Sequence, residues 1–116
     1  MSSKEKFKSN LELTDSEFAE LEKEFGELIE AEVRKDGEVV GAIAFHQPTE
    51  FVMKKANQVL ISDKDVDKRN QIIIRNCAVN GLEFIEKNPG VERSLYILVD
   101  KIVTPYETSL KKRRKT

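Results

Sequence analysis

A change in the spacing of apolar residues, from the period of a helix to that of a strand, constrains this chain most. Apolar and charged residues alternate from Ile29 to Arg34, which is typical of a half-buried strand. Asp36-Gly37 follows, and this dipeptide favours a two-residue type I′ hairpin turn before an apolar return strand at 39–45. A two-stranded hairpin is not stable alone in water. Helices must therefore cover it, or another subunit must extend it.

The turn also predicts which residues of the two strands face each other. On one face the predicted pairs are Val33 with Val40, Ala31 with Ala42, and Ile29 with Ala44. On the other face they are Leu28 with Phe45 and Glu30 with Ile43, a mixture of apolar and acidic residues. This second face is expected to be the less covered one.

Capping residues predict a helix before the hairpin. Thr14 with Glu17 three residues later forms a capping-box pattern, and apolar residues then recur at helical spacing. Gly26 is the expected end because glycine adopts the left-handed conformation without steric strain. Residues 1–13, which are polar, are expected to be flexible.

The second half of the chain is expected to be helical. Helices are predicted to begin at Pro48 or Thr49 and at Asp63, the second of them ending at Asn80-Gly81. Asn88-Pro89-Gly90 indicates a loop, after which a last core helix, containing Leu95, Leu98, Val99 and Ile102, stops at Thr104-Pro105.

These segments predict one α+β domain at residues 14–104, with an N-terminal helix, one β-hairpin and a helical C-terminal half. The hairpin is expected to pack on four to five helices. Residues 105–116 form a basic C-terminal tail. The length of 116 residues fits a single domain.

Composition excludes several classes of protein. No apolar run approaches the length of a membrane span, and the sequence MSSKEKFKSN lacks the apolar core of a signal peptide. The single cysteine indicates a reducing, cytoplasmic setting. The net charge is −1, but residues 1–50 carry 13 acidic and 6 basic side chains, whereas residues 51–116 carry 8 and 14.

No set of residues predicts catalysis, a cofactor or a metal site. His46 has no recognisable carboxylate or nucleophile beside it in the sequence. Cys77 lies on the apolar stripe of its helix, where a free cysteine behaves as a small hydrophobic residue. The run DKDVDK at 63–68 lacks the glycine and glutamate of a calcium loop. The chain is therefore expected not to be an enzyme.

Two groups of residues are candidates for contacting a partner. The apolar residues of the less covered hairpin face are Val39, Ile43 and Phe45, for which burial in the core is the alternative. The basic residues of the tail are Lys111, Lys112, Arg113, Arg114 and Lys115, which either bind a protein or nucleic acid or are simply solvated.

The order of several short motifs is more distinctive than the composition. The hairpin EAEVRKDGEVVGAIAF leads into HQPTEFVMKKA, and a later helix ends in the asparagine-cysteine pair of IIIRNCAVNG. With the closing apolar helix and the lysine-rich end, the chain resembles the small tail assembly chaperones of long-tailed bacteriophages and prophages over roughly residues 20–104. It departs from their pattern at Phe45-His46-Gln47, where a basic residue usually precedes the Pro-Thr pair.

The resemblance implies a non-enzymatic role in the cytoplasm of a bacterial host. Chaperones of this family keep the long tape measure protein soluble, help to recruit tail tube subunits, and are absent from the mature virion. The tape measure protein and the tail tube protein are thus the implied partners. Self-association is left open, and no membrane is expected.

A small nucleic-acid-associated regulator is the alternative. It would use the tail together with the basic residues of the helix at 63–80, which are Lys64, Lys68, Arg69 and Arg75. Its binding would weaken steeply with salt. The net charge of −1 argues against nucleic acid as the partner.

Overall fold

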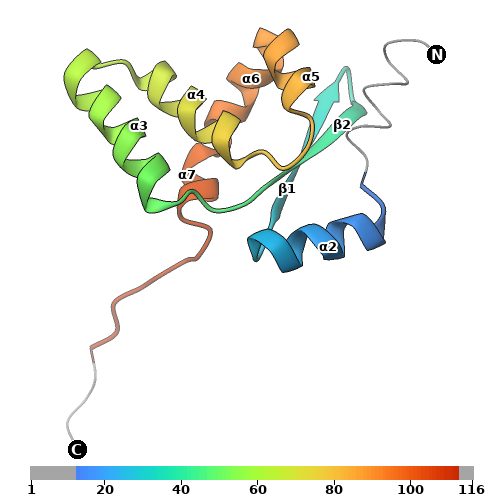
Figure 1. The fold of residues 1–116 in the computed structure, drawn as a ribbon, viewed down its shortest axis with the longest axis horizontal. Helices are drawn as coiled ribbons and strands as arrows, with labels where there is room; N and C mark the ends of the chain where they lie inside the picture. Colours follow the sequence, from blue (N-terminus) through green and yellow to red (C-terminus); the bar gives the residue numbers. More distant parts are fainter. Residues whose placement is uncertain (1–12, 113–116) are drawn as a thin grey trace, which may run out of the picture.

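The hairpin lies between an N-terminal helix and a helical C-terminal half in the computed structural model, which describes residues 13–112 (Figure 1). The domain is therefore α+β, as predicted. The elements are α2 (Asp15–Phe25), β1 (Ile29–Lys35), β2 (Glu38–Phe45), α3 (Glu50–Asp63), α4 (Val66–Cys77), α5 (Leu82–Lys87), α6 (Pro89–Leu95), the 3₁₀ turn η1 (Tyr96–Leu98) and α7 (Val99–Val103). Most of the segment predicted to be flexible, residues 1–12, lies outside the described residues.

The hairpin turn is confirmed, but the predicted register is wrong beyond it. Asp36 and Gly37 have φ angles of 52° and 83°, as a type I′ turn requires. After the first pairs a β-bulge shifts the register, so that Val33 faces Gly41 instead of Val40. Ala31 consequently faces Ile43, Glu30 faces Ala44, and Ile29 faces Phe45.

The bulge has a clear physical effect on the core. Shifting a strand by one residue moves every side chain beyond the shift to the opposite face. Ile43 and Phe45, expected on the less covered face, thereby join Ala31 and Val33 in the core cluster. The larger side chains are buried as a result.

Helix α2 begins and ends where the sequence predicts. The hydroxyl oxygen of Thr14 accepts a hydrogen bond from the backbone N–H of Glu17, whose side chain accepts one from the N–H of Thr14. Gly26, at φ 84°, follows its last residue. No residue of α2 is buried, and its C-terminal end is held by Phe25, whose ring stacks on that of His46 at a centroid distance of 5.0 Å.

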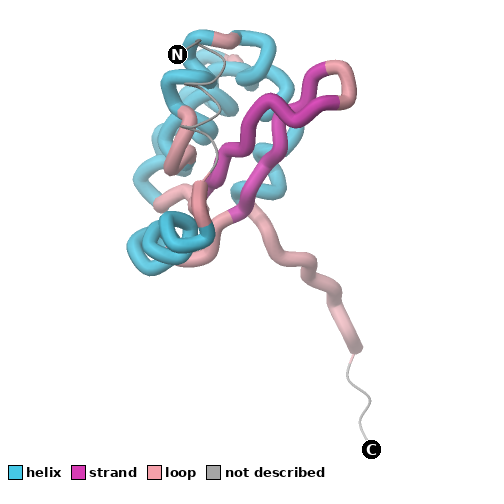
Figure 2. The backbone as a smooth tube through the Cα atoms, turned by 90° about the vertical axis from the view of Figure 1, so that its right-hand side faces the viewer, coloured by secondary structure: helices cyan, strands magenta, loops and turns pink. Residues whose placement is uncertain are grey.

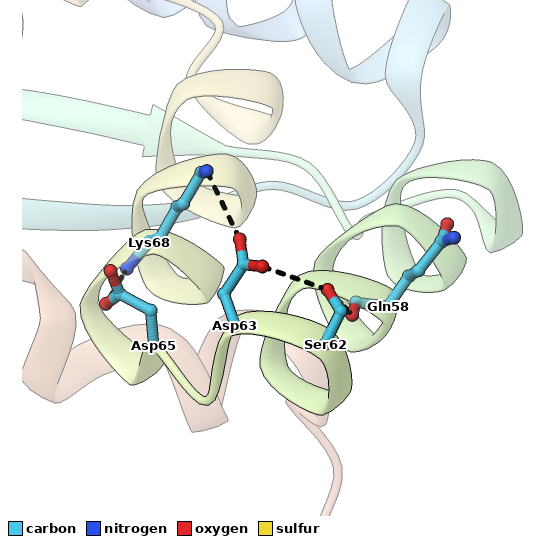
Figure 3. A network of polar contacts seen from close by, with 5 residues as sticks. All are labelled: Gln58, Ser62, Asp63, Asp65 and Lys68. Atoms are coloured by element: carbon cyan, nitrogen blue, oxygen red, sulfur yellow. Dashed lines mark hydrogen bonds and ion pairs between the residues drawn. The ribbon is translucent and has the colours of Figure 1, made fainter.

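The junction between α3 and α4 differs from the prediction by two residues. Thr49 caps α3 as expected, but α3 continues through Asp63 and ends at Lys64, which is left-handed. Asp65 is the residue that caps α4, by accepting a hydrogen bond from the N–H of Lys68. Asp63 instead accepts a hydrogen bond from the hydroxyl of Ser62 within α3 at 3.2 Å, and one from Nζ of Lys68 across the junction at 3.4 Å (Figure 3).

The later helices are shorter than predicted. Helix α4 ends at Cys77, ahead of the expected Asn80-Gly81, because the residues after it pair with β2. The loop predicted at Asn88-Pro89-Gly90 is wrong, because Pro89 begins α6: proline suits the first turn of a helix, where its missing N–H leaves no bond unmade. The predicted last helix is divided into α6, η1 and α7.

The core lies between one face of the hairpin and the helices α3 to α7, and Figure 2 shows the two strands along one side of the helices. Its fully buried large side chains are Phe45, Ile43, Ile73, Ile74, Ile85, Ile102, Val99 and Cys77. Among the described residues, no helix is both long enough and apolar enough to cross a bilayer.

Candidate functional site

The two edges of the hairpin differ, and this difference defines the candidate site. The outer edge of β2 is paired with the segment that follows α4. The N–H of His46 donates to the carbonyl of Cys77 at 3.0 Å, and the N–H of Val79 donates to the carbonyl of Ala44 at 2.9 Å. Ala78 forms an antiparallel bridge with Phe45.

The side chain of Asn80 continues this pairing. Its Oδ1 accepts a hydrogen bond from the N–H of Ala44 at 2.8 Å, and its Nδ2 donates to the carbonyl of Ala42 at 3.0 Å. The amide thus replaces one residue of a third strand, because it offers one acceptor and one donor as a peptide group does. The edge of β2 is covered from Ala42 to His46.

The outer edge of β1 is open. Ala42 and Ala44 direct these bonds away from β1, so they occupy the non-hydrogen-bonded positions of the hairpin. Their partners Glu32 and Glu30 must occupy the same kind of position, and their backbone N–H and C=O groups therefore point outward. Within residues 13–112 the sheet has only these two strands, and no segment pairs with this side of β1.

A cavity of about 540 Å³ lies along the open edge, between β1 and α7. We call it the β1 groove. Its apolar lining comes from the core face of the hairpin and from the C-terminal helices, and its polar lining is mostly acidic. The residues are Glu27, Ile29, Glu30, Ala31, Glu32, Phe45, Leu98, Lys101, Ile102 and Pro105.

The carboxylates of Glu27, Glu30 and Glu32 give the groove a negative rim. Glu32 is paired with Arg34 at 3.0 Å, but both side chains are more than half exposed, so this pair holds little energy. Glu27 accepts a hydrogen bond from the hydroxyl of Tyr106 at 2.8 Å. That bond, together with the negative charge of Glu27, raises the pKa of Tyr106.

The groove is suited to binding an extended peptide. An added strand would bond to the outward backbone groups of β1 and place alternate side chains in the apolar lining, as in β-augmentation. Among the described residues no group of three or more histidine, cysteine, aspartate or glutamate side chains could hold a metal ion.

The histidine and the cysteine of the chain serve the packing of the fold. The Nδ1 of His46 lies 2.6 Å from the carbonyl oxygen of Gln47, and its ring stacks on Phe25. Cys77 is buried, as predicted, and burial raises the pKa of its thiol to about 12. A thiol with this pKa is protonated near neutral pH, which makes it a poor nucleophile.

Only part of the predicted partner surface is exposed. Val39 is 41% exposed near the hairpin tip, whereas Ile43 and Phe45 are 0% and 1% exposed and belong to the core. The prediction that these two side chains lie on an exposed hairpin face is therefore wrong, because the bulge turns them to the core face, which was the alternative stated for them. From that face Phe45 forms part of the lining of the β1 groove. Lys111 and Lys112 are exposed in the tail. Arg113, Arg114 and Lys115 lie outside the described residues.

The basic residues around α4 do not form a common free surface. Lys68 contacts Asp63 (Figure 3), and Arg75 forms two hydrogen bonds with the buried carboxylate of Glu92. The guanidinium of Arg69 donates to the side chain of Asn70 at 3.1 Å. Lys64 is exposed at the end of α3.

Sequence reasoning missed the groove itself. It singled out the hairpin but not Ile29, Leu98 or Ile102, which line the cavity. The signal that could have indicated an open edge is the prediction of only two strands. Which edge is open depends on Asn80, which lies 36 residues from Ala44, and no local pattern indicates that contact.

No family model matches the chain, and the searches among curated proteins and solved structures found no match either.

Proposed function

We propose that this chain is a non-enzymatic tail assembly chaperone of a long-tailed phage or prophage. It binds the tape measure protein in the cytoplasm of a bacterial host and helps to recruit tail tube subunits. The order of the sequence motifs supports this proposal. The observation that carries it is the open edge of β1 beside an apolar groove.

An open strand edge suits a client that is long and not yet folded. Backbone groups are the same in every segment of such a client, so hydrogen bonds to Glu30 and Glu32 would tolerate many sequences. The apolar lining of the groove would favour segments with an apolar residue at every second position. A holdase needs this combination of low sequence specificity and apolar contact.

Exposed apolar side chains on α3 offer a second contact for a client. Phe51 is 75% exposed and Ile61 is 78% exposed, while the helix buries only Ala56 among its residues. Large apolar groups in water favour association with another apolar surface. A long client could cover both α3 and the groove.

Co-expression with a candidate tape measure protein tests the proposal. The soluble fraction of the large protein should rise with the wild-type chain, and the complex should survive a pull-down at both low and high salt because its contacts are apolar and backbone-mediated. Glu30→Pro removes one outward N–H without touching the pairing with β2, so it should weaken the complex. Glu30→Ala is the matched control and should behave as wild type.

Two results would overturn the proposal. One is a tape measure protein that is no more soluble with the chain than without it. The other is nucleic acid retained by the purified chain in a salt-sensitive manner with no protein complex, which would favour the regulatory alternative. Equal binding of the client by Glu30→Pro and Glu30→Ala would exclude the β1 edge as its binding site and would mean that the client binds another surface of the chain.

A further inference from the structure

We propose that the β1 groove of one copy binds the C-terminal segment 107–115 of a second copy, and that two copies exchange these segments in a dimer. This inference concerns the chain alone and does not depend on the chaperone function. It rests on where the tail leaves the domain, on its sequence pattern and on the charge of the groove.

The tail leaves the domain at the groove. Pro105 is part of the lining, and the hydroxyl of Tyr106 is bonded to Glu27 at the rim. Residues 107–112 run away from the domain without further secondary structure (Figures 1 and 2). Two copies related by a twofold axis near Tyr106 would therefore bring each tail to the mouth of the other groove.

The direction of the tail favours exchange over binding within one copy. To enter its own groove the segment would have to turn back sharply, whereas residues 107–112 run outward from the domain (Figure 2). Segment 107–115 would extend about 30 Å as a strand, which exceeds the roughly 23 Å of the seven residues of β1. The tail is thus long enough to follow the whole edge.

The tail has the side-chain pattern that the groove requires. Leu110 is the one large apolar residue between Tyr106 and the end of the chain, and its side chain is fully exposed within one copy. In a strand, alternate residues point to opposite faces. Leu110 can therefore enter the apolar lining while Lys111 and Arg113 lie on the side of Glu30 and Glu32.

Charge selects the tail over the other available strand. A second copy of β1 added to the same edge would bring Glu30 and Glu32 of each copy close together, and like charges across a sheet are destabilising. Lys111, Arg113 and Lys115, which alternate onto the side away from Leu110, would supply positive charge to the acidic rim. Lys101 is the cation in the lining, so the carboxylates are in excess.

Sedimentation equilibrium of the full chain over a wide range of concentration tests the exchange. Wild type should form a dimer, while Leu110→Asp and the double variant Glu30→Lys/Glu32→Lys should weaken it at least about tenfold. All three positions are exposed, so folding should persist, as circular dichroism would verify. Glu20→Lys/Glu24→Lys on the exposed side of α2 changes the net charge equally and should leave the dimer intact.

Mixing the two defective variants distinguishes exchange from other modes of association. The Leu110→Asp copy keeps an intact groove and the Glu30→Lys/Glu32→Lys copy keeps an intact tail, so the mixture should form a heterodimer with one tail bound. A labelled peptide of residues 105–116 should likewise bind the Leu110→Asp protein, and a peptide with serine at position 110 should bind at least about tenfold more weakly.

Four results would overturn the inference. They are a wild-type chain that stays monomeric at every concentration, a dimer that both variants retain, a mixture that stays monomeric, and equal binding of the two peptides. Equal binding of the two peptides would mean that Leu110 adds nothing and that the tail binds the groove through charge alone. Each of the other three results would leave the groove without the tail and so free for a client, and co-expression with a tape measure protein tests that function separately.

Discussion

Arg75 holds the buried carboxylate of Glu92 through two hydrogen bonds, from Nε to Oε2 at 2.8 Å and from Nη2 to Oε1 at 3.2 Å. Gln71 donates a third at 3.2 Å. Burial opposes the charge of Glu92, but these bonds outweigh it and hold its pKa below the usual range. The pair fastens α6 to α4 beneath the hairpin core.

Arg75→Met should lower the free energy of unfolding by about 2 kcal/mol at neutral pH, since it removes two bonds to a buried charge. Urea denaturation measures the change. Lys87→Met, which breaks an ion pair with both side chains more than half exposed, is the control and should cost less than about 1 kcal/mol. Equal losses in the two variants would contradict this account of Glu92.

The same pair predicts a dependence on pH. Because the pKa of Glu92 is lowered in the folded state, its contribution is complete above the glutamate pKa of the unfolded chain, about 4.3, and is lost as the pH falls through the lower folded-state value. The difference in stability between wild type and Arg75→Met should therefore narrow in acid. A difference that stays constant down to low pH would mean that Arg75 acts through packing alone.

Asn80→Ala should be strongly destabilising for a partly exposed residue. It leaves the N–H of Ala44 and the carbonyl of Ala42 without their partner in a half-buried place, which costs about 1–3 kcal/mol. Asn57→Ala on the exposed surface of α3 should stay within about 0.5 kcal/mol of wild type. If thermal or urea unfolding gave both variants the same stability, the amide would not be closing the edge of β2.

Proline should discriminate the two kinds of position along β1. Glu30→Pro removes an outward N–H and should retain the fold, whereas Ala31→Pro removes a bond to Ile43 within the hairpin. We expect Ala31→Pro to be at least about 2 kcal/mol less stable than Glu30→Pro. Urea denaturation measures both stabilities. If Glu30→Pro were the less stable variant, the N–H of residue 30 would be the one that bonds within the hairpin, and the outward assignment of Glu30 would be wrong.

Cys77 should be inert in the native protein. With its pKa raised to about 12 and no exposed surface, its reaction with a chromogenic disulfide at mild alkaline pH should be at least about a thousandfold slower than in guanidinium chloride. Spectrophotometry of the released thiolate measures both rates. Rapid labelling of the folded chain would indicate that α4 opens readily from the hairpin.

The features that sequence predicted correctly are those set by neighbouring residues. The capping box of Thr14 and Glu17, the turn at Asp36-Gly37 and the cap at Thr49 each depend on contacts within three residues. Their geometry follows from the residue types themselves, whatever packs around them.

The errors arose where distant contacts decide. Asp65, and not the predicted Asp63, caps α4 at the junction where α3 and α4 pack together. The bulge beside Val33 turns Ile43 and Phe45 toward core residues of the distant helices, and no local pattern indicates those contacts. The groove could not be predicted from local sequence patterns, because β1, α7 and the start of the tail form it together.

The covered edge of β2 limits how many strands can be added to the sheet. The backbone of residues 78 and 79 and the amide of Asn80 occupy one edge of the hairpin, which leaves each molecule with a valence of one for strand addition. Even the pairing of two β1 edges, which Glu30 and Glu32 disfavour, would stop at a four-stranded sheet made by two copies. Edge-to-edge addition of this hairpin therefore cannot continue into a fibre.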